Sequence, residues 1–119
     1  MRLPLPGELN RRVRLISLSH KPVGENGLTE ESREICEFWG KVEVVGGSIY
    51  FDSSAINETL THRIYIRWVK GETRPVDLQN LIEVECESAR YRVRRRTDVN
   101  DAHRFTMLEC EELMNDSNY

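Results

Sequence analysis

The chain has 119 residues, of which 39% are hydrophobic and 31% are charged, and this length suits one domain with a single core. Its 7 glycines and 4 prolines exclude a collagen-like or low-complexity chain. The net charge of −3 argues against overall positive charge as a grip on nucleic acid. No apolar run approaches the ~20 residues of a membrane span, and the amino terminus lacks a signal-peptide pattern. We expect a soluble, non-secreted domain with flexible residues 1–8 and 113–119.

The first predicted strands form a long hairpin. Residues 12–19 are rich in apolar and β-branched side chains, and residues 31–45 form the return strand. Between them Asn26 and Gly27 indicate a turn, because both residues tolerate positive φ. Trp39 interrupts the alternation of the return strand from its polar side. The expected core face of that strand comprises Cys36, Phe38, Val42 and Val44.

A long inserted loop is predicted next, over residues 46–60. Gly46 and Gly47 end the return strand, because paired glycines favour neither helix nor strand. The residues that follow show no strand alternation, and their apolar side chains are spaced for a short helix of about two turns. Asp52 or Ser53 is the expected cap of that helix.

The rest of the chain adds four predicted strands, at residues 61–69, 81–86, 90–96 and 103–112. In the first of them the side chains of one face are His62, Ile64, Ile66 and Trp68. The opposite face carries Thr61, Arg63, Tyr65, Arg67 and Val69. Six strands with little helix indicate an all-β fold, either a sandwich or a barrel. We expect a small antiparallel six-stranded β-barrel with a long first hairpin and a long inserted loop that carries the short helix.

The strand at residues 90–96 is rich in arginine. By alternation, Arg95 shares one face with Tyr91 and Val93. A simple hairpin would set Phe105 and Met107 beside those two core residues, and a slip of one residue would exchange the faces. The opposite face carries Arg90, Arg92, Arg94 and Arg96. This stripe suits either cross-strand ion pairs within the domain or contact with an acidic partner surface or a phosphate backbone.

The sequence offers no catalytic or metal-binding motif. Its cysteines are Cys36, Cys86 and Cys110, an odd number without a C-x-x-C pair, and no histidine lies near them. We expect reduced thiols buried in strands. A glycine-rich phosphate loop, an H-E-x-x-H motif and a G-x-S-x-G motif are also missing from the sequence. We therefore expect no enzyme, no catalytic residue, no cofactor and no metal.

The order of landmarks along the chain is that of a known family. The landmarks are Gly7–Val13, Glu25–Gly27, Phe38–Glu43, Gly47–Tyr50, Thr61–Trp68, Tyr91–Val93 and Met107–Glu112. The most specific are the Thr-His-Arg-x-x-x-Arg strand at residues 61–67 and the Trp-x-Lys-Val-Glu strand at residues 39–43. This order resembles the head–tail joining proteins of tailed bacteriophages, of the head–tail adaptor or head-closure (stopper) type. The resemblance covers about residues 7–112.

The resemblance implies a structural virion protein that is assembled in the bacterial host cytoplasm. Such proteins bind beneath the portal after DNA packaging, form a ring and join the head to the tail. The implied partners are portal or adaptor proteins, tail-completion proteins, other copies of the chain and packaged DNA in the channel, with no membrane. The free chain can be monomeric.

Two sets of residues follow from the resemblance. In some members a long loop blocks the exit of DNA, and the matching channel or plug loop here comprises Gly46, Gly47, Ser48, Ile49, Tyr50 and Phe51. For the ring or portal interface we expect arginines of one subunit to face acidic groups of the next. These residues are Arg63, Arg67, Arg90, Arg92 and Arg94, with Glu109, Glu111 and Glu112.

Two other classes of function stay open at this point. One is a small OB-like or SH3-like barrel that binds nucleic acid through aromatic side chains interleaved with basic ones. Its candidate residues are Tyr65, Trp68 and Tyr91, beside Arg63, Arg67 and Arg92. The other class is an inert interaction domain of a bacterial protein. The acidic net charge weighs against the first, and the order of landmarks weighs against the second.

Overall fold

The computed structural model describes residues 3–23, 27–45, 48–50 and 57–113, and it confirms the predicted six-stranded barrel. The strands close in the order β1-β2-β5-β8-β7-β6, and each neighbouring pair is antiparallel. Their bounds are β1 Arg11–Val23, β2 Leu28–Val44, β5 His62–Arg67, β6 Leu81–Cys86, β7 Ala89–Asp98 and β8 Phe105–Glu112. The helices of the described residues are short 3-10 turns, η1 Pro6–Glu8, η2 Pro75–Leu78 and η3 Val99–Asp101. None of these helices has the length and apolar character to cross a membrane.

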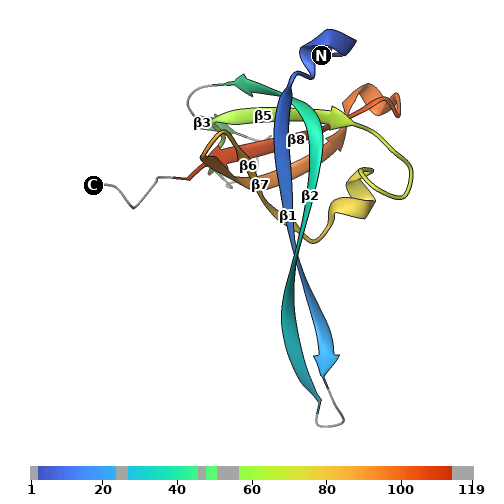
Figure 1. The fold of residues 1–119 in the computed structure, drawn as a ribbon. Coiled ribbons are helices and arrows are strands. Elements are labelled where there is room, and N and C mark those ends of the chain that lie inside the picture. The colour runs from blue at the N-terminus through green and yellow to red at the C-terminus, as the bar shows by residue number, and fades with distance from the viewer. Residues whose placement is uncertain (1–2, 24–26, 46–47, 51–56, 114–119) are drawn as a thin grey trace.

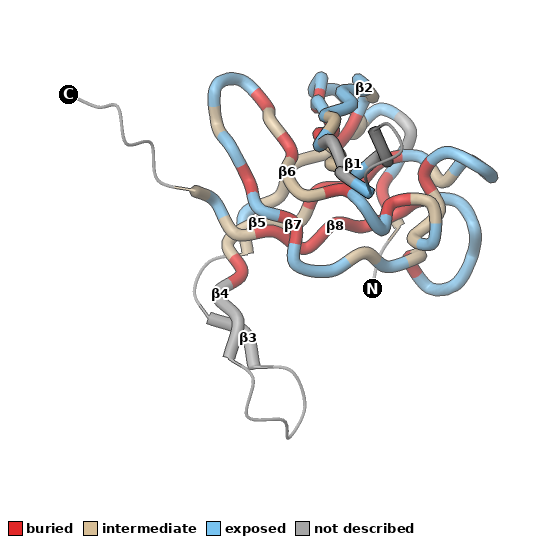
Figure 2. The backbone as a smooth tube through the Cα atoms, turned by 90° about the horizontal axis from the view of Figure 1, so that it is seen from below, coloured by how far each residue is buried: buried red, intermediate tan, exposed pale blue. Residues whose placement is uncertain are grey.

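The barrel encloses one large core cluster, and a smaller cluster lies outside it. The large cluster comprises Val13, Leu15, Ile64, Ile66, Leu78, Leu81, Val84, Cys86, Tyr91, Val93, Leu108 and Cys110. The smaller one comprises Tyr65, Val99, Phe105 and Met107, with Leu3 and Leu9 against it. Successive side chains of a strand alternate between its faces, so β5 and β8 are buried on both faces. Figure 2 shows this buried layer on the barrel strands.

The long first hairpin extends well beyond the barrel (Figure 1). Strand β1 pairs with β6 only over Arg14–Ser17, and β2 pairs with β5 only from Gly40 onward. Past these points β1 and β2 pair with each other alone, from Leu18 opposite Arg33 to Val23 opposite Leu28. We call this two-stranded part the ribbon. Pairing of β2 with β5 begins at Gly40, where a Cβ would lie 2.9 Å from the Tyr65 carbonyl oxygen.

The insertion between β2 and β5 differs in part from its prediction. Its described ends are strands, β3 Ser48–Tyr50 paired with β4 Asn57–Thr59, in a sheet separate from the barrel. Aromatic and β-branched residues favour a pleated strand there over the expected helical turns. The cap candidates Asp52 and Ser53 lie outside the described residues.

The predicted pairing of β7 with β8 is wrong in register. Val93 lies opposite Cys110, but Arg95 lies opposite Glu109, so Arg94 is an extra residue in a β-bulge. Met107 consequently pairs with Thr97, because β7 continues to Asp98 instead of ending at residue 96. The expected contacts of Phe105 and Met107 with Tyr91 and Val93 are replaced by the outer cluster around Tyr65.

Candidate functional site

Two of the four arginines of the stripe, Arg90 and Arg94, form ion pairs with carboxylates of their own chain. Nη2 of Arg90 lies 2.9 Å from an oxygen of Glu83, and Nη2 of Arg94 lies 2.5 Å from an oxygen of Glu111. Both acidic residues belong to strands that flank β7. The sequence left open either cross-strand ion pairs within the domain or contact with a partner. At Arg90 and Arg94 the structure shows the cross-strand ion pairs.

A further predicted interface pair also lies within one chain. Nε of Arg63 on β5 lies 3.5 Å from Oε2 of Glu109 on β8, and the Glu109 side chain is only 8% exposed. Among the described residues, Arg67, Arg92 and Glu112 have no side-chain ion pair, and all three are exposed. These three are the predicted interface charges that stay available to a partner.

Arg96 does not share the face of the other arginines. The bulge at Arg94 reverses the alternation, and the Arg96 guanidinium donates hydrogen bonds to the carbonyls of Leu78 and Leu81, at 2.6 and 2.5 Å. Its burial lowers the pKa of Arg96 from the usual value. Arg96 therefore secures the loop between η2 and β6 and is unavailable as an interface charge.

The predicted plug loop is described only in part. Ser48, Ile49 and Tyr50 form strand β3, whereas Gly46, Gly47 and Phe51 lie outside the described residues. Strand β3 pairs with β4 and with no described strand of the barrel. The insertion is thus a hairpin with its own sheet between two neighbouring barrel strands.

The aromatic face expected for nucleic-acid binding is not formed. Tyr65 and Tyr91 are 3% and 5% exposed and pack in the two core clusters. Burial raises the pKa of both phenols, which is a further sign of their apolar surroundings. Trp68 stacks on His103 with ring centroids 4.7 Å apart. The three rings therefore do not line one groove with Arg63 and Arg92.

The structure brings together aromatic and basic side chains whose proximity was not predicted from the sequence. Arg12 lies opposite Trp39, and its guanidinium stands 4.9 Å from the Trp39 ring centroid. Arg12 also pairs with Glu37 at 2.7 Å. Trp39 is 53% exposed and borders a groove of about 410 Å³ that Arg67 and Phe105 also line. The interruption of the alternation at Trp39 was the available signal.

One of the three thiols contradicts the prediction of buried cysteines. Cys86 and Cys110 are buried, and burial raises the pKa of Cys110 to about 12. Cys36 is exposed, because β2 has no second neighbouring strand before Gly40. The expected core residue Val44 is also exposed, at 73%, since it lies at the end of β2 where the insertion begins.

Potential metal ligands meet at one place in the described residues. Asp98, Asp101 and His103 each bring a ligand atom within 4.8 Å of the others. Nδ1 of His103 is hydrogen-bonded to Asp98, and the His103 backbone N–H donates to the same carboxylate at 3.0 Å. These contacts close the turn that contains η3 and place His103 on Trp68.

The described residues form a closed barrel with cross-strand ion pairs on its surface and two hairpins outside its core. The family model of the phage head completion protein matches residues 4–113. The chain belongs to this family. A comparison with individual curated proteins gave no match. The family is structural, so the chain has a structural role related to the phage head, in the virion and in contact with other phage head or tail proteins.

Proposed function

We propose that this chain completes the phage head by joining it to the tail. In this proposal copies of the chain assemble in the host cytoplasm into a ring beneath the portal, after DNA packaging. Portal or adaptor proteins lie on one side of the ring and tail-completion proteins on the other. The insertion at residues 46–60 faces the channel and helps to retain the DNA. The chain acts by binding alone and catalyses no reaction.

The observation that carries the proposal is the pair of hairpins outside the barrel core. A two-stranded hairpin alone is marginally stable in water, so long examples gain stability from a partner surface. The ribbon continues for six residue pairs past the barrel, from Leu18 opposite Arg33 to Val23 opposite Leu28. The insertion β3–β4 forms a second hairpin with no described barrel partner. Two such elements suit a subunit that contacts several neighbours at once.

Fewer charged residues are available for a ring interface than the sequence suggested. Neighbouring subunits of a ring meet through two different surfaces. Since Arg90, Arg94 and Glu111 are paired within the chain, we propose Arg67, Arg92 and Glu112 as the interface charges between subunits or toward the portal. Reversal of Arg92 to Glu should weaken ring or portal binding in a pull-down at ~50 mM salt, where screening is weak.

The proposed plug is tested by removing residues 48–56. The expected product is a folded barrel, with an unchanged strand spectrum by circular dichroism, in heads that package DNA and then lose it. Nuclease-sensitive DNA in purified heads measures the loss. A control of unchanged length, with Ile49, Tyr50 and Phe51 all replaced by Ser, separates the apolar side chains from the span of the loop. Heads that hold their DNA despite the deletion would refute the plug.

A further inference from the structure

The outer edge of strand β2 is open along the ribbon and beyond it as far as Trp39. From Leu28 to Trp39 its only described neighbour is β1, and pairing with β5 begins at Gly40. Backbone N–H and C=O groups alternate in direction along a strand, so half of those in this stretch point away from β1. The stretch contains no proline and no glycine. It can therefore form an uninterrupted ladder with a further strand.

The open edge of β1 is less suited to pairing. Its stretch beyond β6, from Leu18 to Val23, contains Pro22, which has no backbone N–H to donate. Proline on an edge strand is a common protection against strand addition. Of the two edges of the ribbon, β2 is thus the receptive one.

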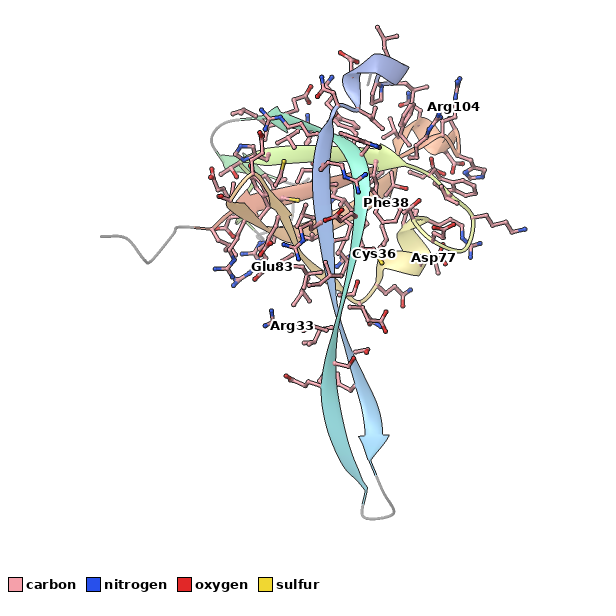
Figure 3. All side chains as sticks on the ribbon, viewed as in Figure 1. Arg33, Cys36, Phe38, Asp77, Glu83 and Arg104 are labelled. Atoms are coloured by element: carbon pink, nitrogen blue, oxygen red, sulfur yellow. The ribbon has the colours of Figure 1, made fainter. Side chains whose placement is uncertain are left out.

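A groove with an acidic wall borders the open edge of β2. Its volume is about 200 Å³, and its lining includes the apolar side chains of Leu15, Phe38 and Leu78. The same groove is lined by the carboxylates of Glu34, Glu72 and Asp77, and by no basic side chain. Figure 3 shows Cys36 and Phe38 on β2 beside Asp77 of η2. We call this site the acidic groove.

The carboxylates of the acidic groove are less neutralised than those of the barrel wall. On the wall, acidic residues such as Glu83 and Glu111 have arginine partners within the chain. In the groove Asp77 pairs with Arg74 at 2.8 Å, whereas Glu34 and Glu72 form no ion pair with a described residue. The charge left over is negative and suits a lysine or arginine side chain of a partner.

The other end of the same edge carries a cation. The 410 Å³ groove beside Trp39 is lined by Arg67, whose guanidinium has no ion pair with a described residue, and by Phe38 and Phe105. Five residue steps, or ~16 Å, separate Glu34 from Trp39 along β2. An extended segment on this edge would meet the acidic groove first and the Arg67 groove about four or five residues later.

We propose that the open edge of β2, from Glu34 to Trp39, binds an extended segment of another phage head or tail protein by β-strand addition. A basic side chain of that segment enters the acidic groove, and an acidic one lies beside Arg67. Main-chain hydrogen bonds supply affinity in this mode, and the grooves on either side supply specificity. The inference rests on the proposed function, because it names how the chain holds a neighbour at the head–tail joint.

Charge disfavours two other occupants. A second β2 edge in antiparallel pairing would bring the acidic residues Glu31, Glu34 and Glu37 of two copies close together. DNA phosphates would face the carboxylates of Glu34 and Glu72. A basic protein segment meets neither obstacle.

Cys36 supplies a natural probe of this edge. It is the exposed cysteine at the acidic groove, whereas Cys86 and Cys110 are buried. Purified chain is labelled at Cys36 with benzophenone-maleimide, reconstituted into heads that lack it, and irradiated. We expect a cross-link to a segment of a different phage protein that contains Lys or Arg. A cross-link to DNA or to a second copy of the chain would overturn the proposal.

Alkylation of unlabelled Cys36 gives a second measurement. In assembled particles we expect iodoacetamide to modify Cys36 at least tenfold more slowly than in the free chain. The double variant Glu34→Lys/Glu72→Lys should lose this protection or fail to enter particles, with a melting temperature near that of the wild type. Glu87→Lys, at the β6–β7 turn, is the control. This variant should enter particles and keep the protection of Cys36.

The outcomes separate the inference from the proposed function. If the wild-type chain is missing from particles or lies away from the head–tail joint, the proposed function fails. If the chain is at the joint and Cys36 reacts as fast as in the free chain, only strand addition on β2 is refuted.

Discussion

The hydroxyl group of Thr73 holds the loop after β5 in place through hydrogen bonds to its backbone. Its Oγ1 accepts a hydrogen bond from the Val69 backbone N–H at 2.7 Å and donates one to the Arg67 carbonyl at 2.5 Å. The Thr73 carbonyl accepts a further bond from the hydroxyl of Thr106 on β8, at 2.5 Å. Thr73 and Thr106 are both 0% exposed. This network fixes the loop that carries Glu72, an acidic-groove residue.

Replacement of Thr73 by valine keeps the shape of the side chain and removes its hydroxyl. The change leaves the Val69 N–H and the Arg67 carbonyl without that partner, at ~1–3 kcal/mol for each group that stays buried. We expect the free energy of unfolding to fall by ~2–4 kcal/mol. Thr73→Ser keeps both bonds and loses one methyl group, for which we expect a loss of only ~1 kcal/mol.

Urea denaturation at ~25 °C, followed by circular dichroism, measures these differences if the slope with denaturant is unchanged. Thr97→Val on β7 is the matched control, since Thr97 is exposed and its change should stay within ~0.5 kcal/mol. A loss below ~0.5 kcal/mol for Thr73→Val, or equal losses for the valine and serine variants, would refute the role of the hydroxyl.

Three further changes test other parts of the structure. Gly40→Ala should destabilise the chain by ~1–3 kcal/mol in urea, because its Cβ would meet the Tyr65 carbonyl at 2.9 Å, whereas Gly7→Ala, with nothing within 4 Å, should be nearly neutral. Iodoacetamide at pH ~8.5 should add one group to the native chain, at Cys36, because Cys86 and Cys110 are buried and burial raises the pKa of Cys110 to about 12. In urea it should add three groups. More than one group on the native chain would contradict the burial of Cys86 and Cys110. The hydrogen bond from Arg74 lowers the pKa of Asp77, so this carboxylate stabilises the fold above its unfolded pKa, and the stabilisation disappears as pH falls through the folded pKa. The melting temperature of Asp77→Asn should therefore lie below that of the wild type at pH ~6 and approach it at pH ~2; a difference independent of pH would contradict the pairing.

Local patterns predict the strands well, because half-buried strands alternate. Residues 81–86 form β6 with the predicted bounds, and Ile64 and Ile66 share one face as predicted, which is the face toward the core. Asn26 and Gly27 predict the turn of the first hairpin, whose strands pair up to Val23 and Leu28. Alternation is a property of neighbouring residues, so the sequence carries it directly.

Predictions of side-chain orientation and burial fail where these depend on a part of the chain that is distant in the sequence. The bulge at Arg94 turns Arg96 toward the carbonyls of Leu78 and Leu81, and no local pattern announces a bulge. Tyr65 is buried on the face opposite Ile64 and Ile66, because residues from the amino terminus and from β8 cover it. Cys36 is exposed because β2 leaves the barrel before that position.

The candidate site was likewise predictable only in part. The charged residues of β5, β7 and β8 were identified, but which of them pair within the chain depends on strand order. Adjacent strands place Arg94 beside Glu111 and Arg63 beside Glu109, which removes them from the free charges. The acidic groove joins Glu34 with Glu72, which lie 38 positions apart in the sequence and meet only through the fold.

The central claim is that the chain is a ring subunit between the phage head and the tail. Electron microscopy of mature heads, prepared with and without this chain, tests it most directly. We expect a ring of density beneath the portal in the complete heads, and heads without that ring and without tails when the chain is missing. Identical portal vertices in the two preparations, or normal tail attachment without the chain, would contradict the claim.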